Sequence, residues 1–302
     1  MAARSFFMNR STPGQGQAII YARQFIAGPG DPKPLESGIR HDFSPHLRIH
    51  VDSRLQVTRV TSGDCELLCL GSIIDPWRPE ADNRTVLDSI AAVSRTFDDL
   101  EAATTAVGGR WLLFARIGRE SRVYPDAAGL KSAFYYRSPD SLWLASQPGL
   151  LADVAGVSID RALAARLHSA DFADAWPGEK TPYPGVKPLL PNHYLDVDEG
   201  VSRRFWPRRP VEPCGTEQAA EVTAAMLEGT IKAVLARYTH AAIALTAGYE
   251  SRCLLACARA ARHRLSFFTI VDAQSPWYEY WTPLRLAWRF HIRYRHLWAR
   301  RG

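Results

Sequence analysis

A short run of small and polar residues near the C-terminal end has the composition of a loop that binds phosphate groups. It comprises Thr246, Ala247, Gly248, Tyr249, Glu250, Ser251 and Arg252. Small side chains at 246–248 leave the backbone N–H groups uncovered, and a helix is expected to follow, with its positive N-terminal end towards the loop. Pyrophosphate is the anion that such a loop favours.

The elements around this loop indicate a parallel sheet. Residues 241–245 form a short, continuous apolar run of the buried parallel-strand type, and a helix is predicted at 251–261. A strand at 265–271, a helix at 283–290 and a strand at 291–297 follow. Alternating strands and helices are typical of an α/β sheet, whose ligands bind beyond the carboxyl ends of the strands. The loop occupies that position.

The preceding part of the chain is predicted to be rich in short strands. Strands are expected at 18–21, 55–60, 66–71, 110–117, 121–125, 131–136, 141–146 and 193–197, and helices at 83–97 and 159–167, the latter with Ser158 as its N-cap. Turn-forming residues separate the four strands from 110 to 146, which predicts an antiparallel meander. Prolines and glycine at 207–215 indicate a linker between domains 1–206 and 216–302.

Composition limits the class of protein. The chain has 302 residues, of which 46% are hydrophobic, and a formal net charge of +6. It lacks the apolar run of about 20 residues that spans a bilayer, and its first ten residues lack a secretory pattern, so a cytoplasmic protein without membrane contact is expected. Arginines crowd the last eighteen residues, but a basic patch alone does not predict nucleic-acid binding.

The five cysteines are odd in number and scattered, which favours reduced thiols over a disulfide framework. They are Cys65, Cys69, Cys214, Cys253 and Cys257. The spacing of His46 and His50 before Cys65 and Cys69 could indicate zinc, but residues four apart on a strand lie about 13 Å apart. Buried core thiols are therefore the favoured interpretation.

The loop resembles the pyrophosphate-binding loop of the asparagine synthetase family, Ser-Gly-Gly-x-Asp-Ser directly after a strand. Thr246 corresponds to the first Ser, Ala247 and Gly248 to the Gly pair, Glu250 to Asp and Ser251 to the last Ser. Two of these five positions are identical to the pattern, and the other three carry conservative substitutions.

Similarity to this family extends in one order over most of the chain. Residues 109–113, 126–130, 134–136 and 142–148 resemble its amidotransferase-type sheet, 186–195 with Phe205 and Trp206 its segment leading to the synthetase domain, and 267–270 and 291–294 its later strands. The resemblance implies an α+β amidotransferase-like (Ntn-type) antiparallel-sheet domain. A partial α/β, Rossmann-like parallel-sheet ATP-pyrophosphatase domain follows.

The resemblance also implies a function, an ATP-dependent carbon–nitrogen ligase that forms amides. ATP activates a small-molecule carboxylate as an acyl-adenylate, which an amine or ammonia attacks, while the loop and Mg²⁺ hold pyrophosphate. Leu245 and Thr269 are expected near the adenosine, residues 246–251 near pyrophosphate, and Glu250 near the metal. An alternative role for Glu250 is that of an N-terminal helix acid.

The sequence departs from the family pattern in two respects. Ala2 stands where glutamine-using members have a catalytic Cys, so glutaminase activity is predicted to be absent. The chain is also predicted to stop inside the ATP domain, leaving an open sheet edge and exposed apolar faces. A partner chain completing that domain, or a homodimer, is expected to cover them. The alternative function is a non-catalytic remnant or binding module.

Overall fold

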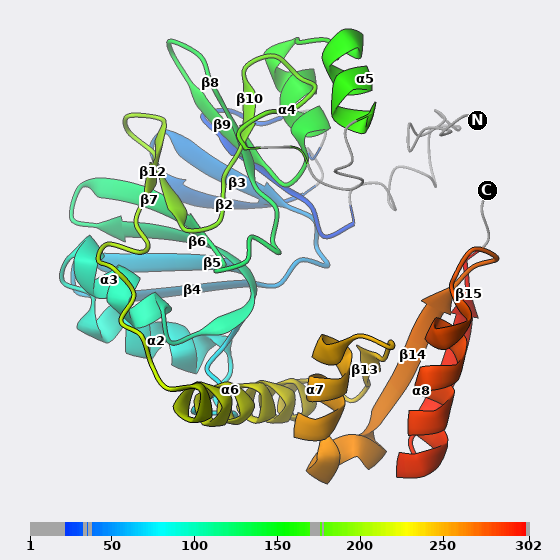
Figure 1. Ribbon diagram of the computed structural model, residues 1–302. Helices are drawn as coiled ribbons and strands as arrows, with labels where there is room; N and C mark the ends of the chain where they lie inside the picture. The colour runs from blue at the N-terminus through cyan, green and yellow to red at the C-terminus, as the bar shows by residue number, and fades with distance from the viewer. Residues whose placement is uncertain (1–21, 33–34, 36–37, 170–175, 177, 300–302) are drawn as a thin grey trace. The chain divides into compact units, whose positions relative to one another are not determined.

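The structure, a computed structural model, describes residues 22–32, 35, 38–169, 176 and 178–299 (Figure 1). The predicted strand at 18–21 and the Ala2 position lie outside these residues. The chain divides into two compact units, Met1–Ser72 with Arg110–Arg209, and Ile73–Gly109 with Pro210–Gly302. The domains 1–206 and 216–302 and the linker 207–215 stay predictions.

The first unit contains two six-stranded antiparallel sheets. The first sheet has the order β10-β8-β9-β1-β3-β2 and comprises β1 (Phe25–Gly28), β2 (Ile39–Ser44), β3 (Leu47–Val51), β8 (Phe134–Arg137), β9 (Leu142–Ala145) and β10 (Val186–Pro188). The second has the order β12-β11-β7-β6-β5-β4 and comprises β4 (Val57–Ser62), β5 (Cys65–Ile74), β6 (Gly108–Ile117), β7 (Glu120–Pro125), β11 (His193–Asp196) and β12 (Val201–Arg204). The predicted antiparallel sheet structure is confirmed.

The main core of this unit joins the two sheets. Its buried side chains come from β1 and β3 of the first sheet and from β5, β6 and β7 of the second. Phe114 makes edge-to-face contacts with Phe25 and Phe43, with ring centroids 6.3 and 5.8 Å apart. Two sheets with apolar inner faces therefore pack against each other as a sandwich.

The predicted single meander over 110–146 is wrong. The hairpins β6–β7 and β8–β9 both form, but they belong to different sheets. Between them, the buried carboxylate of Asp126 accepts hydrogen bonds from the N–H groups of Ala128, Leu130 and Lys131. It also accepts a hydrogen bond from the N–H of Trp111 within β6. This turn carries the chain from one sheet to the other.

Two helices accompany the first sheet, α4 (Pro148–Ala155) and α5 (Arg161–Ser169). Leu150 and Leu151 of α4 pack against Ile26 and Ala145 on the side of the sheet away from the main core. The prediction that Ser158 caps a helix at 159–167 is wrong, because the Asp160 carboxylate accepts the Leu163 N–H at 2.9 Å instead.

The second unit combines helices with a three-stranded parallel sheet, ordered β13-β14-β15. The strands are β13 (Ala241–Ala244), β14 (Leu265–Val271) and β15 (Arg293–Trp298), and the helices are α2 (Asn83–Val93), α3 (Phe97–Thr104), α6 (Thr216–Arg237), α7 (Tyr249–Cys257) and α8 (Trp277–Phe290), with a 3₁₀ turn at Arg259–Arg264. The predicted single helix at 83–97 is two helices, because Thr96 and Asp99 form a capping box that starts α3.

Helices cover one face of the parallel sheet. Core side chains from α6, α7 and α8 pack with Leu265 and Phe267 of β14, and Figure 1 shows α8 running beside β14 and β15. On the opposite face, Ala244 is exposed and Ile270 is 64% exposed. The prediction that 241–245 is a fully buried strand is therefore wrong. The expectation of exposed apolar surface is confirmed.

Two further sequence predictions concern membranes and thiols. None of the described helices is long and apolar enough to cross a membrane. Cys65 and Cys69 are buried, as predicted, whereas Cys214 and Cys253 are exposed. Within the described residues, no group of three or more His, Cys, Asp or Glu side chains is arranged to hold a metal ion.

Candidate anion-binding loop

The candidate loop connects β13 to α7 at the carboxyl end of the parallel strand. Leu245 continues the strand pairing, since its N–H donates to the Phe268 carbonyl at 2.8 Å. Gly248 is the N-cap of α7, with an extended backbone at φ −68°. The sequence-derived position of the loop, between a strand and the N-terminus of a helix, is thus the one observed.

Three consecutive backbone N–H groups of this loop donate to oxygen atoms. The Thr246 N–H donates to Ser251 Oγ at 2.9 Å, the Ala247 N–H to Glu279 Oε2 at 3.1 Å, and the Gly248 N–H to Thr246 Oγ1 at 3.1 Å. Ser251 is buried, and its hydroxyl also lies 3.2 Å from the Thr246 carbonyl oxygen. Thr246 and Ser251 therefore fix the shape of the loop.

Glu279 is the residue of this site that the sequence did not reveal. It lies in the first turn of α8, 32 residues from Ala247. Its carboxylate oxygen accepts a hydrogen bond from the Ala247 N–H of the loop. The sequence offers only one weak signal, an acid at the start of a helix, and such acids are common because they suit the helix dipole. Only the fold brings the two together.

The substitution of Ala247 for glycine has no backbone cost in this structure. Among the described residues, the non-glycine positions with positive φ are Arg23, Asn192 and His291, so Ala247 adopts an ordinary conformation. At Gly248, an added Cβ would stand 3.0 Å from Glu250 Oε2 and 3.2 Å from Thr246 Oγ1. Both neighbours are ends of side chains, which can move.

Glu250 and Tyr249 lie on the exposed side of the α7 N-terminus. Tyr249 is 79% exposed, and the Arg252 guanidinium lies 4.5 Å from its ring centroid. Arg252 Nε also donates to the Gly248 carbonyl at 3.1 Å. Glu250 is an acid in the first turn of α7, where it can complement the helix dipole or contribute a carboxylate to a cation.

Leu245 and Thr269, both expected near adenosine, lie side by side. The Thr269 hydroxyl donates to the Leu245 carbonyl, and it lies 2.5 Å from the hydroxyl of Tyr294. Burial raises the pKa of Tyr294, and the hydrogen bond with Thr269 acts in the opposite direction. The Leu245 side chain belongs to the core, which leaves only its backbone for a ligand. The adenosine contact stays a prediction.

The loop has the donors that a phosphate group requires. Because the Ala247 N–H already donates to a carboxylate oxygen, an anionic oxygen fits at this position. Carboxylates are ligands that Mg²⁺ prefers, usually one or two of them together with phosphate oxygens and water. Glu250 and Glu279 are the carboxylates at this loop, so the residues present are compatible with pyrophosphate and Mg²⁺.

No model of a known protein family matches the sequence, and no curated protein matches it. Similar solved structures include glutamine phosphoribosylpyrophosphate (PRPP) amidotransferase from B. subtilis, complexed with ADP and GMP, at 13% identity and a TM-score of 0.38. A structure described as the allosteric regulatory enzyme of purine biosynthesis has the same identity and TM-score.

These matches cover 91% and 86% of this chain, but only 59% and 62% of the two known chains. The chain thus spans about three fifths of the length of each. At this identity and TM-score we draw no conclusion about ligands or activity from them. Neither structure is described as an asparagine synthetase, so that resemblance continues to depend on the sequence motifs.

Proposed function

We propose that this chain is an asparagine-synthetase-like, ATP-dependent amide-forming ligase whose residues 245–251, with Thr269, form the ATP site. The observation that carries the proposal is the hydrogen bond from the Ala247 N–H to the Glu279 carboxylate. It places an anionic oxygen on the loop whose sequence resembles a pyrophosphate-binding motif. The position beyond the carboxyl end of β13 is also the usual ligand position in parallel sheets.

The residues would act by binding and orientation. The N–H groups of Ala247 and Gly248 would donate to the pyrophosphate part of ATP, with the N-terminal end of α7 adding favourable electrostatics. Ser251 and Thr246 would hold the loop in shape through their hydroxyl groups. Bound Mg²⁺, held by Glu250, would neutralise charge on the leaving pyrophosphate.

Gly248→Ala provides a direct test of the loop. Its φ of −68° suits alanine, but the new methyl group would occupy the space beside the N–H donors. We expect MgATP affinity, measured by calorimetry, to fall at least about tenfold, because phosphate must approach this backbone closely. Gly215→Ala is the matched control, since Gly215 caps α6 with an extended backbone at φ −62° and has open space around it.

The reaction is tested by release of pyrophosphate from ATP in the presence of candidate carboxylates and amines. Activity in the wild type and its loss in Gly248→Ala would support the proposal. Failure of the wild-type chain to bind MgATP at millimolar concentrations would overturn it. Glutamine should yield no glutamate, since Ala2 replaces the catalytic Cys.

A non-catalytic binding module is the alternative function, and one observation favours it. The Glu279 carboxylate already satisfies the Ala247 N–H, so the loop is stable without a phosphate ligand. Binding of MgATP without pyrophosphate release, under any pairing of acid and amine, would distinguish this alternative from the ligase.

The exposed face of the parallel sheet supports the proposed protein partner. Parallel sheets are normally covered on both faces, yet Ile270 is 64% and Leu297 41% exposed here. We propose that a second polypeptide chain, either a partner chain or a second copy, covers this face. Ile270→Lys should then weaken the association, as measured by sedimentation. A wild-type chain that sediments as a monomer, alone and with candidate partners, would contradict it.

A further inference from the structure

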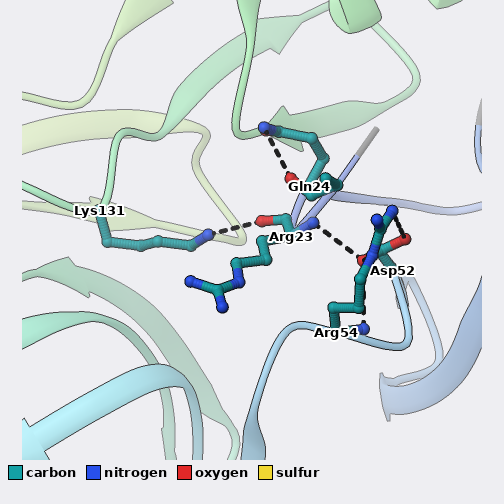
Figure 2. A network of polar contacts seen from close by, with 6 residues as sticks. Arg23, Gln24, Asp52, Arg54 and Lys131 are labelled. Carbon is teal, nitrogen blue, oxygen red and sulfur yellow. Dashed lines mark hydrogen bonds and ion pairs between the residues drawn. The ribbon is translucent and has the colours of Figure 1, made fainter. Parts of the chain in front are cut away.

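A buried lysine in the first unit lies among other cations rather than beside an acid. Lys131 is only 8% exposed, and its ammonium group donates a hydrogen bond to the Arg23 carbonyl at 2.9 Å (Figure 2). An ammonium group has three N–H donors. Within the described residues the Arg23 carbonyl is the one hydrogen-bond acceptor for them. A buried charge with unused donors is costly unless a further partner binds.

Two arginines from different parts of the chain lie near enough to Lys131 for their charges to act on it. Arg110 lies near the start of β6, and its Nε donates to the Leu130 carbonyl at 2.9 Å. This carbonyl belongs to the peptide bond that joins Leu130 to Lys131. Arg23 precedes β1, and its backbone adopts a left-handed conformation at φ 57°. Its backbone N–H donates to Asp52 Oδ1 at 2.9 Å, which holds the Arg23 backbone on the side of its Cα opposite the carbonyl that accepts from Lys131 (Figure 2).

The nearby carboxylates are committed to other donors. Asp126 accepts four backbone N–H groups, including that of Lys131 itself at 2.8 Å. Asp52 accepts the N–H groups of Arg23 and Arg54 and pairs with the Arg54 guanidinium. Neither acid pairs with the Lys131 ammonium among the described interactions.

The lowered pKa of Lys131 is consistent with this geometry. Burial, followed by the charges of Arg110 and Arg23, lowers the pKa of Lys131 from 10.5 to about 8. A lysine whose pKa is lowered by burial and by neighbouring cations is a candidate for a functional site, where a bound anion would balance the charge.

We propose that Lys131, Arg23 and Arg110 form a binding site for a small-molecule oxyanion, either a carboxylate or a phosphate group. The ammonium group supplies its unused N–H donors, and the two guanidinium groups supply the planar donor pairs that match both kinds of oxyanion. All three residues belong to the first unit, whereas the candidate ATP loop belongs to the second. The two sites are therefore separate proposals and can fail separately.

Calorimetric titration with inorganic phosphate and with acetate, at pH 7 and low salt, tests the site. We expect one of the two to bind the wild-type chain, and the stronger probe identifies the class of ligand. Lys131→Met should weaken that binding at least about tenfold, because a charge-assisted hydrogen bond is lost. Lys187→Met is the control, since Lys187 is an exposed lysine of the same unit that pairs with Glu179.

Arg23→Gln is a second variant that preserves folding, because the exposed Arg23 side chain makes no described hydrogen bond or ion pair. It should weaken the same probe, while Gly248→Ala should leave it unchanged. The proposal is overturned if neither probe binds at concentrations up to about 10 mM, which is above the dissociation constants of ordinary ligands. Equal binding by wild type, Lys131→Met and Arg23→Gln would overturn it as well.

Discussion

The carboxylate of Glu279 and the N–H of Ala247 meet at 3.1 Å, although 32 residues separate them in the chain. Glu279 is held there by α8, so its carboxylate competes with any anion that approaches the loop. If the loop binds phosphate, Glu279→Gln should strengthen pyrophosphate binding at least about threefold, because one repelling charge is removed. Calorimetric titration with pyrophosphate measures the change.

Glu221→Gln provides the matched control, because Glu221 is an exposed acid of α6 and makes no described contact with the loop. It removes the same charge and should leave pyrophosphate affinity unchanged. Weaker pyrophosphate binding by Glu279→Gln would show that this carboxylate assists the ligand rather than competing with it.

The lowered pKa of Lys131 predicts a pH-dependent difference in the free energy of unfolding between wild type and Lys131→Met. The folded chain releases this proton near pH 8, whereas the unfolded chain holds it until about pH 10.5. Between these values the unfolded state binds more protons, so the free energy of unfolding rises with pH through this window. Below it, the penalty of the buried charge is fully present.

Urea unfolding of both proteins at pH 7 and pH 10 measures this contribution. The wild type should gain stability relative to Lys131→Met as the pH rises, by at most about 3 kcal/mol. Other titrating groups, such as the tyrosines, contribute equally to both proteins and cancel in the difference. A difference that stays constant from pH 7 to pH 10 would rule out the lowered pKa of Lys131.

The hydroxyl pair of buried Thr269 and half-buried Tyr294 gives a third prediction. Thr269→Val keeps the shape of the side chain but removes the donor to the Leu245 carbonyl. We expect a loss of about 1–3 kcal/mol in the free energy of unfolding, because buried polar groups lose their partner. The pKa of Tyr294 should also rise further, since its hydrogen bond with Thr269 lowers that pKa.

Ultraviolet titration of tyrosine ionisation, compared between wild type, Thr269→Val and Tyr294→Phe, measures this shift. Tyr278→Phe is the control, because Tyr278 is 46% exposed and makes a ring contact with Trp277. A tyrosine titration identical in wild type and Thr269→Val would contradict the hydrogen-bond pair.

The local elements were largely predictable from the sequence, because each carries its own signal. The apolar run at β14 and the turn residues around β6 and β7 gave bounds that match the structure closely. These signals are periodicity and turn chemistry, which depend on near neighbours in the chain.

Relationships between distant segments were not predictable. The assignment of β7 and β8 to different sheets depends on the hydrogen bonds that the Asp126 carboxylate accepts from the N–H groups of β6 and of the following turn. The approach of Glu279 to the loop, and of Arg23 and Arg110 to Lys131, depends on tertiary packing in the same way. A single sequence contains no local pattern for such contacts.

Gly229 provides the last prediction, because it is a buried glycine in the interior of α6. An added Cβ would stand 1.9 Å from the Pro76 carbonyl oxygen, which belongs to the same unit. Alanine favours a helix over glycine by about 1 kcal/mol, but a clash with rigid backbone costs more. Gly229→Ala should therefore lower the free energy of unfolding by about 2 kcal/mol or more.

Urea unfolding separates the two effects when Gly229→Ala is compared with Ala225→Gly, at an exposed position of the same helix. Ala225→Gly reports helix propensity alone and should cost about 1 kcal/mol. If propensity governed both sites, Gly229→Ala would stabilise the protein by a similar amount. That result would contradict the close approach of α6 to Pro76, since no methyl group fits at 1.9 Å from an oxygen atom.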